Sequence, residues 1–212
     1  MKKIYLLSLF VLLISSSSCS SVSNQPVENI FYQDDFSNET TGWPRARTEE
    51  GITDYENGVY RIFVNLENQD FLGTPGLALQ SNVRVEVDAN KVAGSDDNDF
   101  GVMCRYQDNN NFYQFFVSSD GYVGILKMVE GSSQNISGGQ LIDHPAVNMG
   151  NTRNQIRADC LGDTLTMYVN GQKVLTAQDT TFISGGDVGV FAGTYDEPGT
   201  DIHFDNFVVK KP

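Results

Sequence analysis

The chain has 212 residues, a formal net charge of −13 and an isoelectric point near 4.4, and 40% of its residues are hydrophobic. So acidic a surface repels nucleic acid and anionic lipid headgroups, which excludes nucleic acid as a partner and excludes direct electrostatic binding to a membrane. Length and hydrophobic content are sufficient for one domain with a sizeable core.

The first 18 residues have the pattern of a cleaved signal peptide. Two lysines precede an apolar run (4–14) that is too short to span a bilayer, and a run of serines leads to Cys19. A cysteine in this place resembles the lipidation site of a bacterial lipoprotein, so we expect export, cleavage before Cys19 and a lipid anchor on it, with the protein facing the periplasm or the cell exterior. Because Ser16 stands where that site usually has an apolar residue, cleavage by an ordinary signal peptidase is the alternative.

Residues 19–28 show no apolar periodicity, and they include a proline. We predict that this segment is a flexible tether. Between residues 29 and 212 there is no second linker, long helical pattern or repeat, and we predict a single domain there.

Strand patterns dominate the predicted domain. Apolar, β-branched or aromatic runs, several with strict alternation, cover 59–64, 83–90, 100–107, 112–117, 122–128, 155–160, 164–169 and 188–192. Turn sequences rich in Asn, Asp and Gly separate them. Many short strands with no helix between them predict an all-β sandwich or barrel rather than a parallel α/β sheet.

One pair of strands carries a strong hairpin signal. Asn170 and Gly171 separate two such runs, and a two-residue type I′ turn requires positive φ at both positions, which Asn and Gly tolerate best. A regular hairpin with this turn places Met167 opposite Val174.

Two cysteines lie within the predicted strands. Cys104 and Cys160 both fall in the apolar phase of their runs, so both are expected in the core. In an exported protein this favours a disulfide between them, with buried free thiols as the alternative. A catalytic thiol is not expected, because neither His144 nor His203 has a recognisable Cys-His setting.

The two ends of the predicted domain carry motifs of a known fold. The motifs are Asp-Asp-Phe at 34–36, Gly-Trp at 42–43, the hairpin at 163–174, Gly-Asp-Val-Gly-Val-Phe-Ala-Gly at 186–193 and Asp-Asn-Phe-Val-Val at 205–209. Together they resemble concanavalin A-like jelly rolls, near the 3-keto-disaccharide hydrolase domain family, over most of residues 31–209. The resemblance implies a sandwich of two antiparallel sheets. It does not decide the function, because this fold hosts lectins, glycosidases and adhesion modules.

Catalytic carboxylates of the expected kind are incomplete. Retaining glycosidases use two carboxylates about 5 Å apart, and laminarinase-type jelly rolls take them from a strand reading Glu-x-Asp-x-x-Glu. Here Glu86 and Asp88 match the first two positions, but Lys91 stands at the third. We therefore predict no catalytic residue and interpret the two carboxylates either as ion-paired surface groups or as ligand-binding groups. The alternative is an unusual hydrolase that uses the same two carboxylates.

The outward positions of the predicted strands form the candidate binding site. They are Arg84, Glu86, Asp88, Arg105, Gln107, Arg157 and Asp159. On one sheet face such side chains would hydrogen-bond sugar hydroxyls, with Trp43 or Tyr113 stacking on a sugar ring, although Trp43 is equally suited to the core. We therefore predict a carbohydrate-binding or surface-interaction module for an oligosaccharide or polysaccharide. The alternatives are a glycoside-active enzyme, either 3-keto-disaccharide hydrolase-like or laminarinase-like, and a structural envelope protein with a protein partner.

Acidic clusters suggest structural calcium as the cofactor. Asp96, Asp97 and Asp99 lie in one predicted loop, and Asp35 with Asp205 forms a second candidate, in line with the jelly-roll resemblance. The alternative for the loop is a solvated turn held by its own Asx hydrogen bonds.

Overall fold

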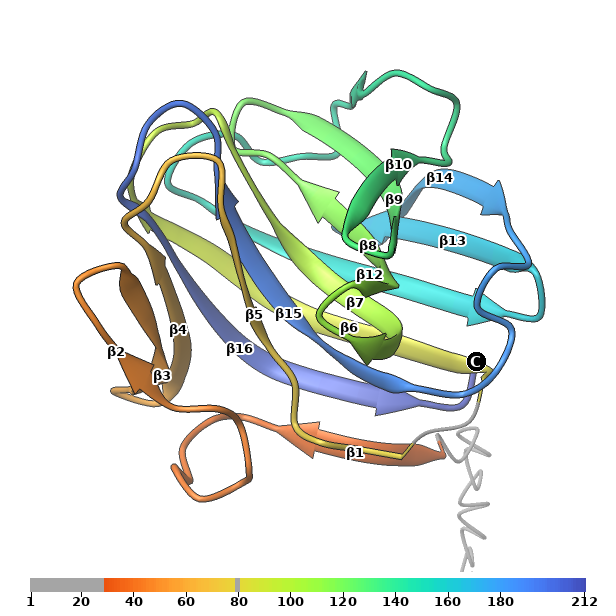
Figure 1. Cartoon of the computed structure of the whole chain (residues 1–212), viewed down its shortest axis with the longest axis horizontal. Helices are drawn as coiled ribbons and strands as arrows, with labels where there is room; N and C mark the ends of the chain where they lie inside the picture. The colour runs from red at the N-terminus through yellow and green to blue at the C-terminus, as the bar shows by residue number, and fades with distance from the viewer. Residues whose placement is uncertain (1–28, 79–80) are drawn as a thin grey trace, which may run out of the picture.

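The structure is a computed structural model that describes residues 29–78 and 81–212. The predicted signal peptide (1–18), the lipidation of Cys19 and the tether (19–28) lie outside the described residues. Sixteen strands form two sheets (Figure 1). Within the described part of the chain, no helix is long and apolar enough to cross a membrane.

The larger sheet has nine strands. In spatial order it runs β14 (Gln172–Gln178), β13 (Thr164–Val169), β12 (Arg153–Leu161), β6 (Val83–Ala93), β16 (Thr200–Lys210), β4 (Val59–Val64), β3 (Gly51–Glu56) and β2 (Ala46–Arg47), and β1 (Ile30–Asp34) also pairs with β16. The central pairs are antiparallel, such as Ile156 opposite Val87. The alternation of apolar and polar residues in 83–90 thus places one face of β6 in the core.

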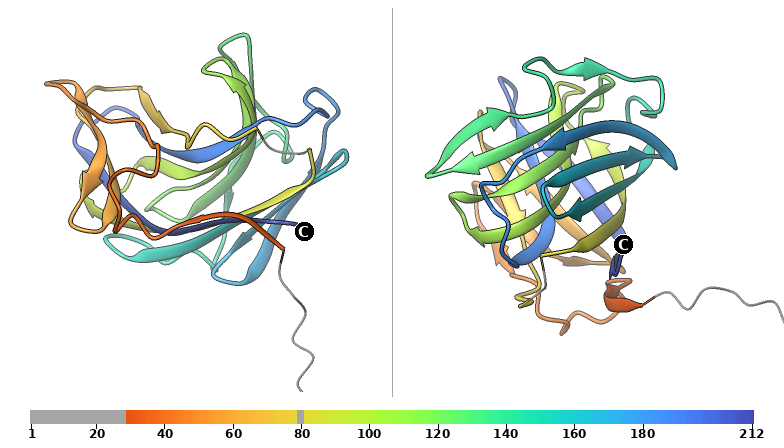
Figure 2. Two further views of the ribbon diagram at one scale, coloured as in Figure 1. Left: turned by 90° about the horizontal axis from the view of Figure 1, so that it is seen from below. Right: turned by 90° about the vertical axis from the view of Figure 1, so that its right-hand side faces the viewer.

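The smaller sheet has seven strands and packs face to face on the larger one. Its order is β10 (Ser132–Asn135), β9 (Tyr122–Val129), β8 (Asn111–Val117), β7 (Asn98–Asp108), β15 (Asp187–Thr194) and β5 (Asp70–Gly73), with β11 (Ile142–Asp143) also paired to β9. Figure 2 shows the two layers and the curvature of the sheets. The predicted all-β jelly-roll sandwich is confirmed.

A disulfide joins the two layers. Cys104 of β7 and Cys160 of β12 are both fully buried and form the predicted bond. Val85 and Val102 are also fully buried in the same core cluster. The core therefore lies between the two sheets and is crosslinked through its middle.

Trp43 belongs to this core. Its ring packs against Phe36, Tyr60 and Phe207 at centroid distances of 4.9–5.2 Å. Its Nε1 donates to Asp34 Oδ2 at 3.0 Å, and only 3% of the residue is exposed. Of the two roles expected for Trp43 the structure gives the core one, because its polar atom is satisfied inside and its ring is covered.

The hairpin between β13 and β14 has the predicted turn. Asn170 and Gly171 have φ values of 50° and 79°, as a type I′ turn requires. The predicted pairing of Met167 with Val174 is wrong, since Met167 lies opposite Leu175. A β-bulge directly after Met167 adds one residue to the facing strand and shifts the register.

Candidate functional site

Part of the predicted polar face exists, on the outer side of the nine-stranded sheet. Arg84 Nε donates to Asp159 Oδ1 at 2.8 Å, and Arg157 Nη2 donates to Asp159 Oδ2 at 2.5 Å. Glu86 pairs with Lys210 at 3.1 Å. Burial raises the pKa of Asp159, but the hydrogen bonds from the two arginines outweigh burial and lower it overall. These side chains neutralise one another, as the ion-paired interpretation of this strand face expects.

Arg105 does not share that face. It lies in β7 of the other sheet, has a φ of 54°, and is 1% exposed. Its guanidinium donates to the carbonyls of Ser81 (3.0 Å), Phe182 (2.7 Å) and Gly162 (2.7 Å). Burial lowers its pKa. The prediction that Arg105 points outward is wrong, because a register irregularity after Cys104 interrupts the alternation and turns the side chain inward.

Tyr113 and Gln107 also lie apart from Glu86. Tyr113 is fully buried in the core, and its hydroxyl donates to Asp179 Oδ1 at 2.7 Å. Burial is the main cause that raises the pKa of Tyr113 to about 12. Gln107 is exposed near the end of β7 and donates to the Gly185 carbonyl at 3.1 Å. The seven predicted polar residues therefore do not form a single surface, because their strands belong to different sheets.

An apolar layer that was not predicted from the sequence covers the outer face of the seven-stranded sheet. Met103, Phe112, Phe116 and Phe191 are at most 1% exposed there, and Leu72, Tyr106, Leu126 and Met128 pack against them. Across the sheet, Phe191 lies opposite Gly101, Gly101 opposite Phe116, and Phe116 opposite Gly124. A Cβ on residue 124 would lie 2.3 Å from Phe116 Cε1, so the missing side chain leaves room for the ring. Apolar residues in both phases of 112–117 were the signal that could have revealed this layer.

A groove of about 710 Å³ opens over this layer. Its floor includes Phe112, Leu72 and Met128, and its rim carries the polar residues Thr48, Glu50, Thr53, Asn68, Gln69, Asp70 and Asn109. The lining residues come from the segment around β2 and β3, from β5 with its preceding loop, and from the turns at the ends of β7 and β9. The β9–β10 hairpin forms one edge of the curved seven-stranded sheet, and the β2–β3 hairpin of the other sheet lies apart from it (Figure 2). We call this cavity the outer groove.

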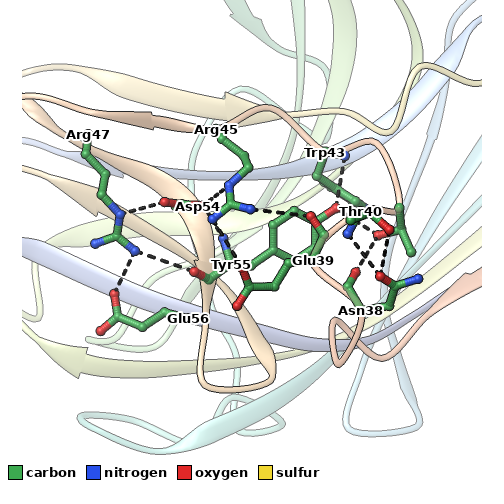
Figure 3. A network of polar contacts seen from close by, with 10 residues as sticks. Asn38, Glu39, Thr40, Trp43, Arg45, Arg47, Asp54, Tyr55 and Glu56 are labelled. Atoms are coloured by element: carbon green, nitrogen blue, oxygen red, sulfur yellow. Dashed lines mark hydrogen bonds and ion pairs between the residues drawn. The ribbon is translucent and has the colours of Figure 1, made fainter.

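Ion pairs fasten the β2–β3 wall of the outer groove (Figure 3). Asp54 accepts from Arg45 Nε at 2.6 Å and from Arg47 Nε at 2.5 Å, and Arg47 also reaches Glu56 at 3.2 Å. Burial raises the pKa of Asp54, but the two arginines lower it overall. The short strand β2 is thus held by side chains as well as by its backbone pairing with β3.

Two carboxylates meet at the β5 wall of the outer groove. Asp70 of β5 and Asp99 of β7 lie on opposite sides of Gly193 in β15. Gln114 Nε2 donates to Asp70 Oδ2 at 3.0 Å, whereas Asp99 Oδ1 is buried without a hydrogen-bond partner. Burial raises the pKa of both carboxyls, and for Asp99 the charges of Asp70 and Asp97 raise it further. The sequence offered no sign of this pairing, since 29 positions separate the two residues.

The predicted calcium ligands are dispersed. Asp96 forms an ion pair with Lys91, while Asp99 turns toward Asp70. Asp97 is largely exposed. Its slight burial raises its pKa, and the negative charges of Asp120, Asp196 and Glu197 raise it further. Asp35 and Asp205 line different cavities, of about 340 and 280 Å³. Among residues 29–78 and 81–212, no three acidic, histidine or cysteine side chains form a ready metal-ligand group.

Comparison with solved structures finds several proteins of similar fold. The carbohydrate-binding module CBM66 from Bacillus subtilis is 21% identical with a TM-score of 0.54, over 80% of this chain and 96% of that one. An endo-acting O-glycanase structure from the human gut microbiota, concerned with mucin breakdown, is 10% identical with a TM-score of 0.62, over 86% of this chain and 99% of that one.

A xylan β-1,4-xylosidase from Bacillus halodurans C-125 is 16% identical with a TM-score of 0.58, over 84% of this chain, which spans only 39% of the xylosidase. At these identities the similarities show the fold alone. No family model matches the chain, and no curated protein matches its sequence. The resemblance to the 3-keto-disaccharide hydrolase family therefore stays a prediction.

Proposed function

We propose that the protein is an exported carbohydrate-binding module that holds an oligosaccharide or polysaccharide in the outer groove without cleaving it. The observation that carries the proposal is the composition of this groove, an apolar floor bordered by a polar rim. A sugar ring has an apolar face of C–H groups and an edge of hydroxyls, so it needs both kinds of surface at once. Ligand sites in general combine an apolar lining with a few placed polar groups.

The rim supplies both hydrogen-bond donors and hydrogen-bond acceptors. Asn68, Gln69 and Asn109 carry amides that donate and accept, Thr48 carries a hydroxyl, and Glu50 only accepts. Leu72 and Met128 are partly exposed and offer contact to the apolar face of a ring. The fold similarity to CBM66 supports the same assignment.

Binding without cleavage is supported by where the carboxylates lie. Glu86 and Asp88 are on the outer face of the nine-stranded sheet, away from the outer groove, and Glu86 is paired with Lys210. Asp70 lines the groove, but the neighbouring Asp99 is 5% exposed and its Oδ1 is fully buried. Of these two carboxylates, a substrate in the groove therefore meets only Asp70, so Asp70 and Asp99 cannot act together as the pair that retaining glycosidases require.

Export and a lipid anchor at Cys19 complete the proposal. The disulfide between Cys104 and Cys160 supports an oxidising compartment. A signal peptide over residues 1–18 would deliver the domain there, and the segment 19–28 would connect it to the membrane.

The test is a glycan-array screen, followed by affinity measurement with the best oligosaccharide. Leu72→Arg, which places a long charged side chain in the groove, should weaken binding at least about tenfold, or about 1.4 kcal/mol. Glu86→Gln on the opposite face is the matched control and should bind like wild type. Loss of binding in Glu86→Gln with full binding in Leu72→Arg would contradict the groove. Release of reducing ends by wild type would instead favour the enzyme alternative.

A further inference from the structure

The two carboxylates at the β5 wall of the outer groove are brought together by a glycine. Gly193 lies opposite both Asp70 and Asp99 in the sheet. A Cβ on residue 193 would lie 2.2 Å from Oδ1 of Asp70 and 2.2 Å from Oδ1 of Asp99. The two oxygens are therefore no farther apart than twice this distance, and only a glycine leaves them room.

The pair lacks a compensating positive charge in its own contacts. Asp70 is half-buried and receives a hydrogen bond from the neutral amide of Gln114, while Asp99 is 5% exposed with Oδ1 unpartnered. Lys91, in the preceding strand, is bound to Asp96. Two desolvated carboxylates at this distance cannot both stay charged without a proton or a cation.

We propose that Asp70 and Asp99 together bind one calcium ion through their Oδ1 atoms. Calcium takes oxygen ligands at about 2.3–2.6 Å, so one ion can bridge two oxygens that lie up to about 5 Å apart. The Asp70–Asp99 separation is within this limit. Since Asp70 lines the outer groove, water entering from the groove can complete the coordination shell.

The surroundings favour a calcium ion over other cations. Burial raises the pKa of Tyr195, and the charges of Asp99, Asp70, Asp97 and Asp120 raise it further, so all four carboxylates act on this region. Acidic neighbours concentrate cations at the site. Zinc prefers nitrogen and sulfur ligands and magnesium demands a near-ideal octahedron, whereas calcium accepts an irregular set of oxygens.

The ion would fix one wall of the outer groove. Strand β5 is the last strand of its sheet and pairs with β15 over four residue pairs. A bridge from Asp70 to Asp99 of β7 would tie β5 to a second strand. This site does not depend on whether the groove binds carbohydrate.

The experiment is a calcium titration of the EDTA-treated protein, followed by calorimetry and thermal unfolding. We expect binding of one calcium ion per chain, and a rise in Tm of about 5–10 °C at a hundredfold excess over Kd. Asp99→Asn should abolish both responses. Asp96→Asn is the matched control, because Asp96 belongs to the same segment but pairs with Lys91, and it should keep both responses.

The Asp99→Asn variant is expected to fold, because its amide can donate to Asp70 and the repulsion is removed. Its Tm without calcium should equal or exceed that of calcium-free wild type. If it does not fold, Asp70→Asn provides the second test of the same site. The proposal is wrong if millimolar calcium changes neither heat nor Tm of wild type, or if both variants respond to calcium as wild type does.

Discussion

Cys104 in β7 and Cys160 in β12 are linked by a disulfide that crosses the interior between the two sheets. The two residues are 56 positions apart, and constraining a loop of this size in the unfolded chain stabilises the native state by about 4 kcal/mol. We expect Cys104 and Cys160 to resist labelling by a thiol reagent in the unfolded, unreduced protein. Reductant should lower the denaturation midpoint of wild type.

The matched control for the disulfide is the double variant Cys104→Ala and Cys160→Ala. It should be less stable than wild type and insensitive to reductant. Equal midpoints for wild type with and without reductant, under conditions where labelling shows full reduction, would contradict a stabilising bond.

Arg105 should be one of the most sensitive positions in the molecule. Arg105→Met removes the donors of three backbone carbonyls at Ser81, Gly162 and Phe182. Buried acceptors left without donors are costly, so we expect a loss of about 4 kcal/mol in the free energy of unfolding. Gln107→Met, at an exposed site two residues on, should change it by less than about 1 kcal/mol. Chemical denaturation measures both, and equal effects would show that the buried contacts of Arg105 carry no special weight.

The contrast between Arg105 and Cys104 shows what could be predicted from the sequence. Period-2 alternation correctly placed Cys104, Cys160 and the valines of β6 in the core, because a regular strand sends alternate side chains to opposite faces. The same rule failed at Arg105, one residue after Cys104. The pairing between β7 and β8 is irregular there, and the side chain of Arg105 turns inward. Positive φ at a non-glycine residue within a strand leaves no mark in hydrophobic periodicity.

The outer groove could not be predicted for a different reason. The apolar layer beneath it depends on strand order, since Phe116 lies between Gly101 and Gly124 only because β8 is flanked by β7 and β9. Asp70 and Asp99 likewise meet only through β15, which comes much later in the chain. Local patterns report which face a side chain takes, but not which strands become neighbours.

Asp179 should contribute to stability in a pH-dependent way. Its carboxylate accepts from Tyr113 Oη, Lys127 Nζ and the Thr181 amide, each at 2.7 Å. Burial raises its pKa, but these hydrogen bonds outweigh burial and hold it well below its usual value. A carboxyl with a lowered folded-state pKa stabilises the protein above the unfolded pKa, and the contribution is lost as the pH falls through the folded one.

We therefore expect Asp179→Asn to be less stable than wild type by about 2 kcal/mol at neutral pH, with the difference shrinking below about pH 4. Denaturation curves across this range measure it. Glu67→Gln, at an exposed position, is the control and should follow wild type throughout. A constant difference between Asp179→Asn and wild type would mean that the charge of Asp179 is irrelevant.

We expect membrane anchoring to depend on Cys19. If the cysteine is lipidated, Cys19→Ala should move the protein from the membrane fraction to the soluble exported fraction, because the acidic domain has no charge attraction to headgroups. Fractionation and the mass of the mature N-terminus check this. An unmodified Cys19, or an N-terminus beyond it, would contradict the anchor.

The apolar layer beneath the outer groove should be sensitive to a single added methyl group. In Gly124→Ala the new Cβ would lie 2.3 Å from Phe116 Cε1, so the ring must move out of its place over the sheet. Overpacking of this kind costs about 1–3 kcal/mol, and the displaced ring would disturb the other side chains of the apolar layer beneath the groove. We therefore expect lower stability together with weaker ligand binding. The double variant Gly124→Ala with Phe116→Leu removes the clashing ring atoms and should recover part of the stability. No recovery would show that residue 124 needs glycine for its backbone and not to make room for Phe116.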